Sequence, residues 1–107
     1  MSSFENRREN YLSDDEFQAF QKILMQNPKA GDVIKGTGGL RKARVASAKR
    51  GKGKRSGSRV IYYWYLEGQQ FWLFTIYGKD ELEDLTAVEK RIFRAALEEE
   101  VKSHGKA

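Results

Sequence analysis

Residues 59–77 read RVIYYWYLEGQQFWLFTIY, and this stretch decides the fold that the sequence predicts. Two segments, Arg59 to Leu66 and Phe71 to Tyr77, are rich in the β-branched and aromatic residues that favour strands. The residues between them, Glu67 to Gln70, are polar and include a glycine, which is typical of a hairpin turn. We therefore expect two antiparallel strands.

The register of this hairpin has two alternatives. If Leu66 pairs with Gln70, Arg59 lies opposite Tyr77; if Leu66 pairs with Phe71, Arg59 lies opposite Gly78. A shift by one residue moves the side chains of a strand to the other face of the sheet. Tyr77 therefore shares a face with Arg59 only in the first alternative, and both remain open.

A further strand is expected upstream at residues 40–46, after a turn that the glycines at positions 36, 38 and 39 mark. The side chains alternate there, so Lys42 and Arg44 project together from one face. Three consecutive antiparallel strands then form a meander. In a meander the start of the middle strand lies beside the ends of both neighbours, so we expect Arg44, Arg59, Tyr77 and Lys79 to gather there, with Lys42 slightly further along.

Capping boxes predict where two helices begin. Ser13 with Glu16 starts a helix at Asp14, which ends at Asn27 and Pro28 because proline disfavours helix in the residue before it. Its apolar positions are Phe17, Phe20, Ile23 and Leu24.

The second capping box, Thr86 with Glu89, starts a C-terminal helix that we expect to run to about Lys102, with a frayed tail from Ser103. The apolar stripe of this helix is expected at Val88, Ile92, Ala95 and Ala96. Together these elements predict an α+β fold, with residues 1–107 forming a single domain.

Composition narrows the function. The chain has 107 residues, no cysteine and a single histidine, His104, which falls in the expected tail. Disulfides, thiolate metal sites and histidine-based triads are therefore excluded. The acidic cluster Asp80, Glu81, Glu83 and Asp84 reads as a solvated approach to the last helix, so no metal and no cofactor are expected. Without a signal peptide or membrane-spanning stretch, we expect a cytoplasmic protein with no membrane partner.

The charges are segregated along the chain. Residues 33–66 contain no Asp or Glu but hold ten of the twenty basic residues, while the rest carries ten basic and fifteen acidic residues. This asymmetry is expected of a protein that binds a polyanion, although a solvated basic loop is the alternative. The candidate RNA- or ribosome-binding residues are Arg41, Lys49, Arg50, Lys52, Lys54 and Arg55, most of them in a glycine-rich segment at residues 47–58 that reads as a mobile loop.

The converging cations suit a scissile phosphodiester. Positive groups aimed at developing charge stabilise a transition state, and a nearby phenol or amine can exchange protons. The candidate catalytic residues are Lys42, Arg44, Arg59, Tyr77 and Lys79. The alternative is that Arg59 is an ordinary edge cation and Tyr77 an ordinary strand aromatic.

Four stretches resemble a known family: YLSDDEF at residues 11–17, NPKAGDVIKGTGGLRKARVA at 27–46, GKGKRSGSRVIYY at 51–63 and TIYGKDEL at 75–82. They are similar to the HigB-type branch of the RelE superfamily of toxin–antitoxin systems. The resemblance implies a curved antiparallel sheet flanked by helices, ribosome-dependent cleavage of messenger RNA, and neutralisation by a helix-turn-helix, HigA-like antitoxin.

By position, the resemblance makes Lys42 and Arg44 the basic pair for proton transfer and phosphate contact, and Arg59 the arginine that opens the next strand. Lys79 matches a basic position after the third strand, whereas Asp80 stands where some members have an arginine. An additional edge strand at the start of the family's chains is expected to be short or missing here. The same fold includes ParE-type gyrase poisons, and a noncatalytic RNA-binding module is the other alternative.

Overall fold

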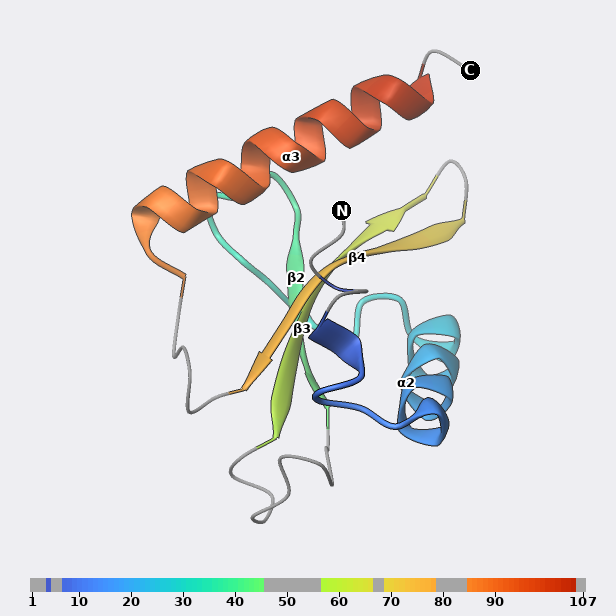
Figure 1. The fold of residues 1–107 in the computed structure, drawn as a ribbon. Coiled ribbons are helices and arrows are strands. Elements are labelled where there is room, and N and C mark those ends of the chain that lie inside the picture. Colours follow the sequence, from blue (N-terminus) through green and yellow to red (C-terminus); the bar gives the residue numbers. More distant parts are fainter. Residues whose placement is uncertain (1–3, 5–6, 46–56, 67–68, 79–84, 106–107) are drawn as a thin grey trace.

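The computed structural model describes residues 4, 7–45, 57–66, 69–78 and 85–105. The elements are α2 (Asp14–Gln26), β1 (Asp32–Val33), β2 (Arg41–Val45), β3 (Ser58–Tyr65), β4 (Gln70–Gly78) and α3 (Ala87–Gly105). The strands form one antiparallel sheet in the order β1-β2-β3-β4 (Figure 1). The α+β class and the meander are confirmed, and the described sheet has four strands.

The described residues of the N-terminal segment, 4 and 7–10, do not form the extra edge strand. It is the two-residue strand β1, which pairs Asp32 with Lys42 and Val33 with Arg41. Phe4, Arg7 and Arg8 are helical instead. The Arg7 Nε donates a hydrogen bond of 2.8 Å to the Ile76 carbonyl oxygen, so a side chain satisfies part of the outer edge of β4.

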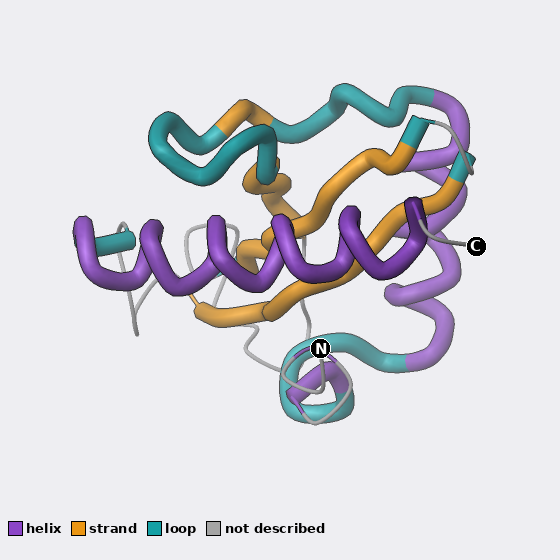
Figure 2. Tube along the Cα trace, turned by 90° about the horizontal axis from the view of Figure 1, so that it is seen from above, coloured by secondary structure: helices purple, strands orange, loops and turns teal. Residues whose placement is uncertain are grey.

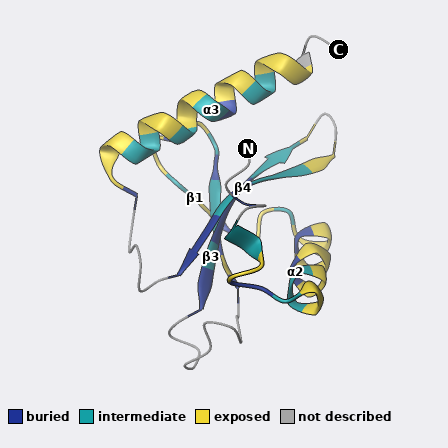
Figure 3. Cartoon of the chain, in the orientation of Figure 1, coloured by how far each residue is buried: buried dark blue, intermediate teal, exposed yellow. Residues whose placement is uncertain are grey.

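The two long helices cover opposite faces of the sheet. Both capping boxes form: the Ser13 Oγ accepts from the Glu16 N–H at 3.1 Å, and the Thr86 Oγ1 accepts from the Glu89 N–H at 3.1 Å. Figure 2 shows α3 running across the strands. Figure 3 shows that the buried residues concentrate in the sheet, whereas the outer sides of both helices are exposed.

The α2 face is the larger core. Phe20 and Leu24 of α2 pack with residues of all three long strands, among them Val60, Tyr62 and Ile76. Ile23, expected on the apolar side of the helix, is 54% exposed. Ile23 is rotated about the helix axis away from the side on which Phe20 and Leu24 contact the sheet. Only part of the expected apolar stripe of α2 is therefore buried.

The apolar stripe expected for α3 is wrong for three of its four members. Val88 and Ile92 are 55% and 60% exposed, and Ala95 is also exposed. The helix packs through Leu97, Phe93, Ala96 and Val101, of which the expected stripe contained only Ala96. This second set includes a phenylalanine, whose ring buries more apolar area than valine or alanine.

The expected fraying from Ser103 is also wrong, because α3 continues to Gly105. The ring of His104 lies 4.5 Å from that of Trp72 and 5.5 Å from that of Tyr65, centroid to centroid. These ring contacts anchor the last turn on the sheet, so His104 is not an unstructured tail residue.

A β-bulge sets the register between β3 and β4. Tyr65 pairs with Gln70 at the turn, which neither expected alternative contained, and the Gln69 N–H donates to the Leu66 carbonyl at 3.2 Å. The register then shifts between Ile61 and Tyr62, leaving Phe74 as the additional residue on β4. Beyond the bulge, Arg59 lies opposite Tyr77, as in the first alternative.

Tyr62 ties the central strand to the connection between α2 and β1. Its hydroxyl donates to the Pro28 carbonyl at 2.8 Å and accepts from the Gly31 N–H at 3.0 Å. A Cβ at Gly31 would lie 2.8 Å from the Lys42 carbonyl oxygen, so only glycine fits against β2. The buried hydroxyl therefore holds the segment that leads into the edge strand.

We expect Tyr62→Phe to lower the free energy of unfolding by about 1 to 3 kcal/mol, because it leaves the buried Gly31 N–H and the half-buried Pro28 carbonyl without their partner. Urea unfolding measures the change. Tyr63→Phe, which removes a hydroxyl from a half-buried ring on the α3 face, is the matched control. Equal stability of the two variants would contradict this role.

Burial also raises the pKa of Tyr62, against the smaller opposing effects of the Gly31 hydrogen bond and the Arg41 charge. Above about pH 10 the unfolded chain releases this proton while the folded protein keeps it, so stability falls as the pH rises toward the folded pKa. Unfolding free energies of wild type and Tyr62→Phe measured from pH 8 upward should differ in slope above pH 10. Parallel curves would show that ionisation of the Tyr62 phenol is not coupled to unfolding.

Candidate nucleic-acid interface

The expected cluster forms at one end of the sheet, where the end of β2, the start of β3 and the end of β4 lie side by side (Figure 1). Arg44 pairs with Arg59, and Arg59 pairs with Tyr77. Lys42 lies two residues from Arg44 and pairs with Ile61, which belongs to the α3 face. Because directly paired residues share a face, all four side chains belong to the α3 face.

Arg44 and Arg59 place like charges directly opposite each other. Paired residues of antiparallel strands have Cβ atoms about 4.5 to 5.5 Å apart, and like charges in this arrangement destabilise the sheet. Arg44 is exposed and Arg59 half-buried. Neither makes an ion pair with any residue in the described part of the chain, and the Arg59 Nη1 reaches only the Ser58 carbonyl, at 3.4 Å. An anion bound between the guanidinium groups would remove the repulsion.

Tyr77 belongs to the core more than to the surface. It is 5% exposed and packs in the same cluster as Leu40, Phe74 and Leu85. Tyr77 is the cross-strand neighbour of Arg59, so its ring lies beside the Arg59 side chain. Its role in proton transfer stays a prediction.

Arg41 is separated from the other cations. The alternation along β2 puts it on the α2 face, where its Nη1 donates to the Gly31 carbonyl at 2.7 Å and to the Lys29 carbonyl at 3.5 Å. These bonds stabilise the same connection that Tyr62 holds. The geometry thus gives Arg41 a structural role, and RNA binding by this residue stays a prediction.

The other candidates lie outside the described residues. These are the catalytic candidate Lys79 and the binding candidates Lys49, Arg50, Lys52, Lys54 and Arg55. Their assignments stay predictions from the sequence.

Two lysines that the sequence analysis did not select lie close to the cluster. Lys35 and Lys90 line a hollow of about 240 Å³ together with Lys42. Lys35 belongs to the acid-free stretch and could have been selected by charge. Lys90 lies far from Lys35 and Lys42 in the sequence, and no motif around it predicts a functional role. The packing of α3 against the sheet brings it to the hollow.

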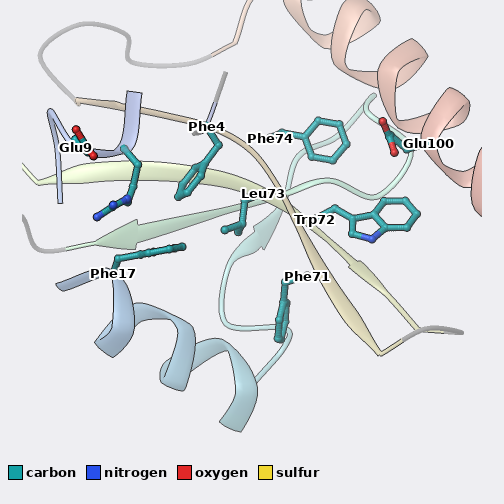
Figure 4. A pocket seen from close by; sticks show the side chains of 9 residues that line it. Phe4, Glu9, Phe17, Phe71, Trp72, Leu73, Phe74 and Glu100 are labelled. Atoms are coloured by element: carbon teal, nitrogen blue, oxygen red, sulfur yellow. The ribbon is translucent and has the colours of Figure 1, made fainter. Parts of the chain in front are cut away.

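A larger hollow lies elsewhere in the described part of the molecule. It measures about 540 Å³ and runs along β4 between the N-terminal segment, α2 and α3 (Figure 4). Phe4, Phe17, Phe71 and Leu73 make its walls mainly apolar. The Arg8 that lines it is paired with Asp14 at 2.9 Å, so no unneutralised cation marks it as a polyanion site.

The described residues contain no group of three or more His, Cys, Asp or Glu side chains arranged to hold a metal ion. None of the helices in the described ranges is long and apolar enough to span a membrane. No protein-family model matches the sequence, so the family resemblance rests on the four sequence motifs.

We expect Arg44→Gln to raise the free energy of unfolding by about 0.2 to 1 kcal/mol, since it removes a like-charge pair. Inorganic phosphate should raise the melting temperature of the wild type by more than that of the variant, because the anion relieves this repulsion. Thermal unfolding with and without phosphate measures both effects. The control is Lys102→Gln, which removes an exposed charge from the end of α3. A larger loss of stability in Arg44→Gln than in the control would contradict the repulsion.

Proposed function

We propose that this chain is a HigB-type toxin of the RelE superfamily, an endoribonuclease that cleaves messenger RNA on the translating ribosome. The observation that carries the proposal is the pair of guanidinium groups on the α3 face, Arg44 opposite Arg59, without an acidic partner among the described residues. Such a pair suits a phosphodiester, whose negative charge grows in the transition state. The assignment to the HigB-type branch, and with it the dependence of cleavage on the ribosome, rests on the resemblance of the four sequence motifs.

The proposed reaction is attack of the ribose 2′-OH on the adjacent phosphorus. A bond forms between O2′ and phosphorus while the bond from phosphorus to O5′ breaks, leaving a 2′,3′-cyclic phosphate and a 5′-OH. Arg44 and Arg59 bind the phosphoryl oxygens. Arginine does not give up its proton in proteins, and Tyr77 is buried, so Lys42 is the group suited to protonate the leaving O5′.

The base that takes the 2′-OH proton is proposed to come from solvent or from the ribosome. Each paired position of the cluster carries a cation or a phenol, and the one histidine, His104, lies at the far end of α3 against Trp72. The described residues of the cluster include no base, so in this proposal the ribosome completes the site. The same lack of a base favours the second candidate, a noncatalytic RNA-binding module.

The proposed inhibitor is a helix-turn-helix, HigA-like antitoxin. A carboxylate between Arg44 and Arg59 would satisfy both charges as a phosphate does. An antitoxin bound over this part of the α3 face would prevent messenger RNA from binding there, and its carboxylate would also relieve the repulsion between Arg44 and Arg59.

We expect Arg59→Ala to lower the cleavage rate by about a hundredfold to a thousandfold, because one preorganised cation is lost from the transition state. The measurement is cleavage of a translated message in a reconstituted translation system, with the chemistry of the new ends determined. Arg91→Ala, which removes an exposed arginine from α3, is the control and should cleave at the wild-type rate.

Three results would count against the assignment. A folded Arg59→Ala protein that cleaves as fast as the wild type would remove Arg59 from the site. Ends that carry a 5′-phosphate would exclude attack by the 2′-OH. A wild type that binds RNA without cleaving it on ribosomes would establish the binding module instead.

A further inference from the structure

A second group of cations surrounds a hollow next to the arginine pair. Lys35 follows β1, Lys42 lies on β2 and Lys90 is in the first turn of α3, and all three line the same hollow of about 240 Å³. Its apolar wall comes from Val33, Ile34 and Leu85, and Asp32 is the acidic residue in the lining. Among the described residues, the lining thus holds three lysines and one carboxylate, and that carboxylate belongs to an exposed residue.

The fold holds Lys90 at this hollow. Its Cδ lies 3.7 Å from where a Cβ at Gly36 would be, so the aliphatic part of the side chain runs against the connection from β1 to β2. The capping box fixes the first turn of α3, and the Glu89 carboxylate is engaged there by the Thr86 N–H at 2.8 Å. The neighbouring acidic side chain is therefore occupied by the cap.

The hollow lies close to the arginine pair. Lys42, which lines it, is two residues from Arg44 on β2, and both side chains belong to the α3 face. A second hollow of about 260 Å³ shares Asp32 and Lys42 with it but opens toward Phe20 and Ile23 of α2, so the two hollows are separate. Residues two apart on a strand are about 6.6 Å apart, which is of the order of the distance between neighbouring phosphates in an extended nucleic-acid strand. The first hollow and the arginine pair are thus neighbours along β2 on the α3 face.

We propose that Lys35, Lys42 and Lys90 form a second phosphate subsite, which binds the RNA phosphate adjacent to the one held by Arg44 and Arg59. The subsite rests on the proposed function, because its ligand is the same RNA strand. It positions the strand, and Lys35 and Lys90 act without touching the reacting phosphate.

The test uses short 2′-O-methyl oligouridylates, which cannot undergo attack by O2′. One compound has a single phosphodiester, a second has two, and a third has two linkages of which one is a neutral methylphosphonate. Binding is measured at low salt by calorimetry. We expect the wild type to bind the second compound about tenfold more tightly than the third, since exposed ion pairs contribute up to about 1 kcal/mol each.

The double variant Lys35→Gln/Lys90→Gln should lose this difference while it still binds the single-phosphodiester compound as the wild type does. Lys22→Gln/Lys102→Gln changes the net charge equally with exposed lysines of α2 and α3 and should behave as the wild type. Retention of the tenfold difference in Lys35→Gln/Lys90→Gln would overturn the subsite. A wild type that binds the single phosphodiester no better than Arg44→Gln does would instead contradict the proposed function.

Discussion

The pairing of β3 with both of its neighbours is the constraint on which the rest of the structure depends. β3 carries Tyr62, which holds the connection from α2, and Arg59, which meets Arg44 on one side and Tyr77 on the other. The bulge at Phe74 makes the second pairing possible. If the register at the turn continued along β4, Arg59 would face Ile76, and Tyr77 would move to the α2 face.

The same pairing creates an electrostatic cost, for which the proposed binding of a phosphate offers an explanation. Two guanidinium groups are brought together on the α3 face without a carboxylate from the described residues, and the lysine hollow extends this positive surface toward α3. The packing of both helices offsets the repulsion in the free protein. In the proposed function a bound phosphate offsets this repulsion, because both guanidinium groups are attracted to the same anion.

Features set by local interactions could be predicted from the sequence. The capping boxes at Ser13 and Thr86 involve residues three apart, and the alternation that joins Lys42 to Arg44 is a property of one strand. The bulge could not be predicted, because it depends on how β4 meets both β3 and α3. The rotation of α3 and the arrival of Lys90 beside Lys35 depend on tertiary packing in the same way.

The central claim is that the cation cluster cleaves translated RNA, and the most direct measurement maps RNA ends in cells after induction of the protein without an antitoxin. The account predicts new ends within translated messages, carrying 5′-OH groups, that disappear when translation initiation is blocked. Messages that remain intact while gyrase-linked DNA breaks accumulate would contradict it and favour the ParE-type activity.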